Sequence, residues 1–191
     1  MRNNKIISFV LPFTFIILGC STQQLFSIKE VENDFIYKDK IQEFNKDSIS
    51  NFLKLMEQDM NKPKAILNEL HLSIFQNPKD VDSIITEQTY FLYNIQSLTT
   101  KRTRITVIGT NDNWINEITL LSFNKFGRLC NKSILAELGG DQDYFIESQS
   151  KLQNDSTYIK TIKNFKYDIN TNSNKLINQF QDTVNIKQGN K

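Results

Sequence analysis

The chain has 191 residues, with 23 Lys and Arg against 21 Asp and Glu and a formal net charge of +2. Removal of residues 1–19, which is expected below, takes away two basic residues and no acidic one, so the remaining charges balance. Balanced charge argues against nucleic-acid binding through bulk charge and against a polybasic membrane tether. With 39% hydrophobic and 11% aromatic residues, the chain can bury a core, so one compact domain is expected.

The first twenty residues have the features of an export signal. Arg2 and Lys5 form a short basic head, and residues 6–18 form an apolar run that is too short to span a bilayer. The run ends in Ile-Leu-Gly-Cys at 17–20. This ending resembles the lipobox of bacterial lipoproteins, which implies a signal peptide over 1–19 and a lipid anchor on Cys20. The alternative is a buried apolar segment followed by a plain thiol.

Lipidation of Cys20 would attach the chain to a membrane without a transmembrane helix, because two or three acyl chains, such as palmitate, anchor stably. Surface-exported lipoproteins of Bacteroidota often carry an acidic cluster just after the anchor cysteine. The first acidic residue here is Glu30. We therefore expect a cell-envelope protein at the outer membrane that faces the periplasm.

The first part of the mature chain predicts a tether and then helix. Residues 20–46 are polar and are expected to tether the domain to the membrane. A helix is expected from Asp47 or Ser48, and Asn61 and Pro63 would end it. Its apolar face comprises Ile49, Phe52, Leu53, Met56 and Met60. Residues 64–76 fit helix and strand patterns alike, and the helical reading extends the segment over 47–80.

From about residue 86 the pattern changes to short β-branched and aromatic runs separated by turn residues. Strands are expected near 89–98, 103–109, 115–124, 128–138, 144–151, 157–167 and 176–186. Tight turns without crossover helices predict an antiparallel meander over 86–188. In the last strand, Leu176, Phe180, Val184 and Ile186 are expected to share a half-buried face.

These elements predict a single α+β domain over 47–191, in which an N-terminal helical segment packs on an antiparallel β-meander of six to seven strands. A β-barrel or a sandwich is the alternative. The lipobox, the helical first third and the segments "LLSFNKFGRL", "GGD" and "NDSTYIKT" together resemble uncharacterised lipoproteins of Bacteroidota. That group carries no assigned activity, so the resemblance implies location and fold and no catalytic residue.

Little in the sequence points to catalysis, a metal or a cofactor. His71 is the only histidine, and no phosphate loop, nucleophile elbow or Cys-x-x-Cys motif occurs. Cys130 is expected to be a small buried side chain. Asp141 and Asp143 are expected to shape a turn. Oxygen-bearing residues alternate from Asp168 to 174 as in a calcium loop, but the sixth and twelfth positions lack Gly and Glu, which favours a turn.

A short motif predicts modification. Bacteroidota glycosylate exported proteins at Asp-Ser/Thr followed by an aliphatic residue or Thr, and four matches occur where chance gives roughly one. The expected acceptors of an O-glycan are Ser48, Ser83, Ser156 and Thr183. Ser48 could instead cap the helix, and the match at 155–157 could instead form a turn.

Aromatic residues gather in the strand region, where most are expected to form the core. Trp114, beside a polar turn, is the candidate for an exposed binding surface. Lys101, Arg102 and Arg104 form a small basic patch that is expected to be a solvated hairpin end.

The sequence favours a non-enzymatic, lipid-anchored binding module that holds an envelope protein or glycan through its sheet face or edge strand. The alternative is an inhibitor or immunity-type protein against a toxin or hydrolase. A hydrolase is disfavoured by the missing motifs.

Overall fold

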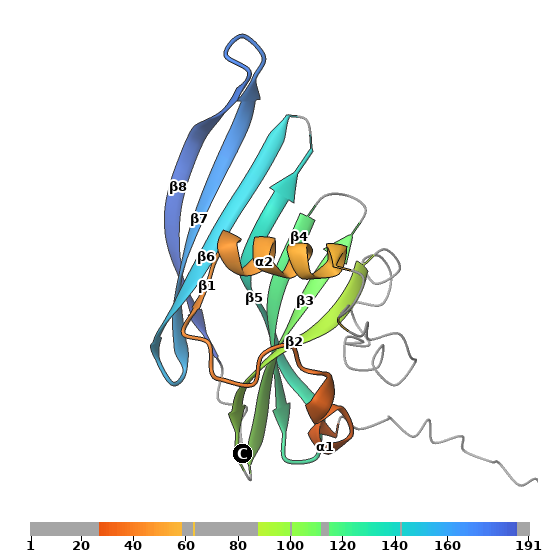
Figure 1. Cartoon of the computed structure of the whole chain (residues 1–191). Helices are drawn as coiled ribbons and strands as arrows, with labels where there is room; N and C mark the ends of the chain where they lie inside the picture. The colour runs from red at the N-terminus through yellow and green to blue at the C-terminus, as the bar shows by residue number, and fades with distance from the viewer. Residues whose placement is uncertain are drawn as a thin grey trace, which may run out of the picture.

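The computed structural model of the chain describes residues 27–58, 63, 88–99, 101–111, 115–141 and 143–186. Most of them belong to one antiparallel sheet, whose strands β2 to β8 lie side by side in chain order (Figure 1). The strands are β2 Gln88–Leu98, β3 Arg102–Asn111, β4 Ile115–Asn124, β5 Leu129–Gly140, β6 Tyr144–Asn154, β7 Thr157–Asp168 and β8 Ser173–Asn185. The expected meander is therefore confirmed, with each strand close to its expected bounds.

The sheet is open. Strand β2 forms one edge and β8 the other, and these two strands do not pair with each other. The alternative of a barrel or a two-sheet sandwich is therefore wrong for the described part of the chain.

The sheet divides between β5 and β6. These strands pair only over Glu137–Gly140 and Phe145–Ser148. Beyond that stretch the short strand β1, Glu43–Phe44, takes the place beside β6 and pairs with Lys151 and Ser150. As a result β6, β7 and β8 diverge from β2–β5 in the direction of the β6–β7 turn at residue 155 (Figure 1). We call β6, β7 and β8 the wing.

One helix of three turns, α2 Lys46–Glu57, lies across the sheet (Figure 1). It begins after Asn45, whose side chain accepts a hydrogen bond from the backbone N–H of Ser48 at 3.1 Å, while the Ser48 hydroxyl accepts from the backbone N–H of Asn45. This reciprocal pair satisfies two backbone donors at the helix start. A helical segment running to residue 80 is not shown, since most of residues 59–87 lie outside the described part.

The two faces of β2–β5 carry separate cores. On one face, Ile49 and Phe52 of α2 pack with Phe44 against apolar side chains that include Phe91, Ile108, Ile118, Leu120 and Leu135. On the other face, Val31 and Phe35 pack against Leu92, Ile105, Val107, Leu121 and Phe123. Val31 ends the short helix α1 Ile28–Val31, and Phe35 directly follows the short helix η1 Glu32–Asp34. Residues 28–44, within the expected tether, therefore contact the sheet.

Burial on both faces accounts for the near-continuous apolar run of β4, where the seven residues from Glu117 to Phe123 are all buried. The wing differs sharply. Nearly every side chain of β8 is exposed, including Leu176 at 48% and Phe180 at 48%.

The half-buried face expected for β8 is therefore wrong at Leu176 and Phe180 and holds only toward the end of the strand, at Val184 and Ile186. Asn164 lies opposite Asn178, whereas Phe165 lies opposite Leu176, so Ile177 forms a bulge. The bulge reverses the alternation of faces, and Leu176 and Phe180 point to opposite sides of the sheet. Half-buried Val184 packs against the core, and Ile186, just beyond the strand, is buried in it.

Candidate functional site

One face of the wing presents side chains in rows that run across its three strands. Residues opposite each other in an antiparallel pair share a face, so the register defines each row. From the end near residue 145 downward, the rows are Phe145–Phe165–Leu176, Glu147–Lys163–Gln179, Gln149–Thr161–Gln181 and Lys151–Ile159–Thr183. We call this surface the glutamine face.

A shallow groove of about 470 Å³ lies on the glutamine face. Its lining comprises Glu43, Gln149, Ser150, Lys151, Leu152, Gln153, Ile159, Thr161 and Gln181. The lining includes the Gln149, Gln153 and Gln181 amides and the Thr161 hydroxyl, each of which can donate and accept hydrogen bonds. The Gln181 amide donates to the Thr161 hydroxyl at 3.4 Å, and Glu43 lies opposite Lys151 in the register. The groove therefore combines hydrogen-bonding side chains with apolar surface, and its two charged residues balance.

The two rows between the groove and the β5–β6 turn, which contain Phe145 and Glu147, are held by other contacts. Glu147 Oε1 lies 3.4 Å from Lys163 Nζ, and its Oε2 lies 3.8 Å from Lys46 Nζ at the start of α2. Phe145 and Phe165 pack edge to face with ring centroids 5.9 Å apart. These contacts join β6 to β7 and to α2, next to the Gln149–Thr161–Gln181 row that lines the groove.

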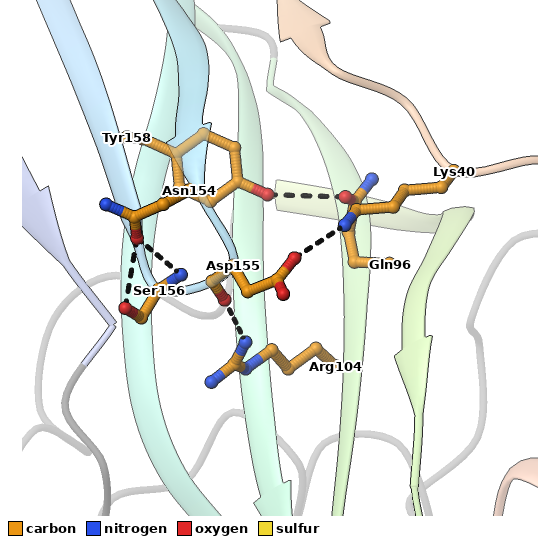
Figure 2. A network of polar contacts seen from close by, with 7 residues as sticks. All are labelled: Lys40, Gln96, Arg104, Asn154, Asp155, Ser156 and Tyr158. Atoms are coloured by element: carbon orange, nitrogen blue, oxygen red, sulfur yellow. Dashed lines mark hydrogen bonds and ion pairs between the residues drawn. The ribbon is translucent and has the colours of Figure 1, made fainter.

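A buried polar cluster closes the space between the β6–β7 turn and β2 (Figure 2). The Tyr158 hydroxyl donates to Gln96 Oε1 at 3.2 Å, and the Gln96 amide donates to Asn94 Oδ1. Asn94 in turn donates to the backbone carbonyl of Tyr37 at 3.1 Å. Burial raises the pKa of Tyr158 to about 12. These contacts join the wing, β2 and the N-terminal segment.

The β6–β7 turn itself is fixed by charged groups from two other elements (Figure 2). Arg104 Nη1 donates to the backbone carbonyl of Asp155 at 2.6 Å, and Lys40 Nζ lies 3.3 Å from the Asp155 carboxylate. Burial lowers the pKa of Arg104. Arg104 is thus half-buried and bound, which corrects the expectation that it belongs to a solvated hairpin end; Lys101 is exposed as expected.

Two glutamates lie opposite each other on β4 and β5 but serve the structure. Glu137 is 2.8 Å from Lys160 Nζ and accepts from the Ser148 hydroxyl at 3.1 Å. The buried Glu117 accepts from the Thr119 hydroxyl at 3.0 Å. Neither glutamate lines the groove. Their partners satisfy them in place, which is what a buried carboxylate requires to be tolerated.

Several expected site residues can now be placed. Ser48 belongs to the helix cap. Ser156, in the β6–β7 turn, is half-buried and donates to Asn154 at 3.1 Å (Figure 2). Thr183 is exposed on the glutamine face beside the groove. Cys20, His71, Ser83 and Trp114 lie outside the described residues. The structure therefore brings only Thr183 close to the groove.

Cys130 is exposed, so the expectation of a buried side chain is wrong. At the start of β5, side chains alternate between half-buried and exposed, and Cys130 falls on the exposed side. Its thiol donates to the backbone carbonyl of Arg128 at 3.5 Å.

Turn geometry was predicted well. Asp141 Oδ1 accepts from the backbone N–H groups of Asp143 and Tyr144 at 3.0 and 2.8 Å. Asp168 Oδ1 accepts from the N–H of Asn170 at 2.9 Å, and Asn172 has φ of 51°. Among the described residues, no three His, Cys, Asp or Glu side chains lie grouped as a metal site needs.

The groove was missed at the level of sequence. Its signal was present as polar side chains at every second position of β6, from Glu147 through Gln149 and Lys151 to Gln153. That alternation marks a solvent-facing side of a strand, but it does not show which neighbouring strands complete the surface.

Comparison with protein-family models, with curated proteins and with solved structures gives no match for this chain. The described helices include none that is long and apolar enough to cross a membrane.

Proposed function

We propose that the chain is a lipid-anchored, non-enzymatic binding module of the cell envelope, and that its groove holds a neutral glycan. The groove on the glutamine face carries this proposal, because its lining is rich in amides and hydroxyls on an exposed face of the sheet. Sugar hydroxyls both donate and accept hydrogen bonds, as the Gln149, Thr161 and Gln181 side chains do.

The shape of the groove supports an extended ligand. A small-molecule site usually encloses most of its ligand, whereas this groove is shallow and lies on an exposed sheet face. Ile159 supplies an apolar patch for the C–H face of a sugar ring. The charged lining residues, Glu43 and Lys151, lie opposite each other, which favours a ligand without strong net charge.

The proposed anchor would hold the domain close to a membrane. Seven residues separate Cys20 from the start of α1 at Ile28. A chain of that length spans at most about 25 Å when extended. We propose an outer-membrane location facing the periplasm, where the module could hold an envelope glycan near the lipid surface.

Replacement of the anchor thiol tests the location. Full-length Cys20→Ser is expected to remain unprocessed by lipoprotein signal peptidase and to lose labelling with palmitate. Metabolic labelling and a gel shift measure both effects, with Cys130→Ser as the matched control that keeps the label. Equal palmitate labelling of Cys20→Ser and the parent would exclude lipidation at this position.

Substitutions in the groove test the ligand. The mature lipidated protein in detergent is applied to an array of neutral oligosaccharides, and at least one is expected to bind. Gln149→Ala together with Gln181→Ala is expected to weaken that binding by about tenfold or more, because each lost hydrogen bond is worth about 1 kcal/mol. Gln179→Ala, on the same face but outside the groove, is the control. Binding of peptides alone, or equal loss in the control, would refute a glycan site.

A further inference from the structure

Strand β8 has one edge available for pairing. It runs over 13 residues and pairs with β7 on one side, and no strand in the described part of the chain pairs with its other side. Leu176, Ile177 and Phe180 are 48%, 56% and 48% exposed. No proline interrupts β8, and Lys175 and Asp182 are its only charged residues. A long edge with exposed apolar side chains and few charges is a template for another strand.

We propose that β8 pairs antiparallel with β8 of a second copy of the chain, about a two-fold axis at Gln179. A two-fold axis perpendicular to a sheet places residues of the same face opposite each other. The register with β7 puts Lys175, Asn178, Phe180 and Asp182 on one face and Leu176, Gln179 and Gln181 on the other, with Ile177 in the bulge. The pairing between the two copies must therefore place each residue opposite a residue of its own face.

An axis at Gln179 matches the charges. With Ile177 bulged in both copies, Asn178 lies opposite Phe180 of the second copy, and Lys175 lies opposite Asp182 of the second copy. The symmetry produces this ion pair twice. The two Phe180 rings also lie diagonally across the axis on one face, a distance that aromatic side chains can bridge.

Neighbouring registers lose this complementarity. An axis at Phe180 places Lys175 opposite Val184, and an axis at Asn178 places Lys175 opposite Phe180. Within one copy, Lys175 lies opposite Lys166, and like charges in that position destabilise a sheet. The second copy's Asp182 would place an opposite charge beside Lys175. This self-complementarity identifies a second copy as the occupant of the edge, independently of any ligand in the groove.

Disulfide trapping tests the register. In a Cys130→Ser background, Gln179→Cys is expected to form a covalent dimer in the full-length lipidated protein under mild oxidation. A mixture of Asn174→Cys and Thr183→Cys is expected to form a disulfide between the two variants. Neither variant alone is expected to form a covalent dimer. Lys166→Cys, exposed on β7, is the control that stays monomeric. No dimer through Gln179→Cys, or equal trapping of Asn174→Cys alone, would overturn the proposal.

Charge exchange gives a second measurement on unlinked protein. Lys175→Asp is expected to weaken the dimer by about tenfold in sedimentation of the lipidated protein in detergent, because both ion pairs become like-charge pairs. Lys175→Asp with Asp182→Lys is expected to restore it to within about twofold. Failure of this rescue with an unchanged melting temperature, a monomeric parent, or a different protein paired to β8 would each contradict a self-paired edge.

Discussion

Raising the pH from 9 to 12 is expected to unfold the protein, because three buried tyrosines resist ionisation. Burial raises the pKa of Tyr93 and of Tyr158 to about 12, and burial with the nearby Glu117 raises that of Tyr90 further. An unfolded tyrosine ionises near pH 10. The stability that these groups supply is therefore fully present below pH 10 and is lost as the pH rises toward 12. Between these pH values each tyrosine lowers the free energy of unfolding by about 1.4 kcal/mol per pH unit. The combined loss from the three tyrosines approaches the whole stability of a typical domain.

Tyr158→Phe separates ionisation from packing. At pH 7 the variant is expected to lose about 1 kcal/mol, because Gln96 Oε1 no longer accepts the Tyr158 hydroxyl. Between pH 10 and 12 its stability should fall less steeply than that of the parent, so the two curves converge. Urea unfolding at several pH values measures both slopes. Tyr144→Phe, on an exposed ring, is expected to follow the parent. Parallel curves for Tyr158→Phe and the parent would contradict ionisation at this site.

Local chemistry explains why the meander could be predicted. Most strands show apolar or β-branched residues bounded by Asn, Asp or Gly, and these residues make the turns. At 124–128, the Asn124 carboxamide accepts the backbone N–H groups of Phe126 and Arg128, and Gly127 supplies a φ of 74°. Such information lies within a few residues, so sequence patterns capture it.

The helix starts earlier than expected, because neighbouring residues compete to cap it. Asp47 and Ser48 were the expected caps, but Asn45 is the cap and Ser48 takes the third helical position. Both Asn and Ser favour a helix N-terminus, and their mutual hydrogen bonds decide between them. A shift of this size lies within a single turn and leaves Ile49 and Phe52 on the buried face, so the prediction of an amphipathic helix holds over α2.

Exposure of the wing could not be predicted, because it depends on distant segments. Leu176 and Phe180 have the same hydrophobicity as core residues of β4, but the core beneath α2 reaches the wing only near its β6–β7 turn, at Leu152, Tyr158 and Val184. The bulge at Ile177 then reversed the alternation on which the expected face rested. The groove likewise depends on β1 lying beside β6, a pairing of Glu43 with Lys151 across more than a hundred residues.

The division of the sheet separates stability from binding. Strands β2–β5 supply most of the core, whereas the wing leaves its glutamine face and the β8 edge to solvent. Substitutions of exposed side chains in the wing should therefore alter association more than folding, and substitutions under α2 should do the reverse. This contrast makes the wing variants usable as tests of binding in folded protein.

Phe52→Ala is expected to lower the free energy of unfolding by about 3–5 kcal/mol, because it removes a buried ring and leaves a cavity. Phe52 is fully buried on α2, and its ring lies 5.1 Å from that of Phe91 between centroids. Urea denaturation measures the loss. Lys54→Ala, exposed on the same helix, is expected to change stability by less than about 0.5 kcal/mol. If Phe52→Ala does not fold, Phe52→Leu should show a smaller loss. If Phe52→Leu and Phe52→Ala were both as stable as Lys54→Ala, the packing of α2 would contribute nothing to the stability of the core.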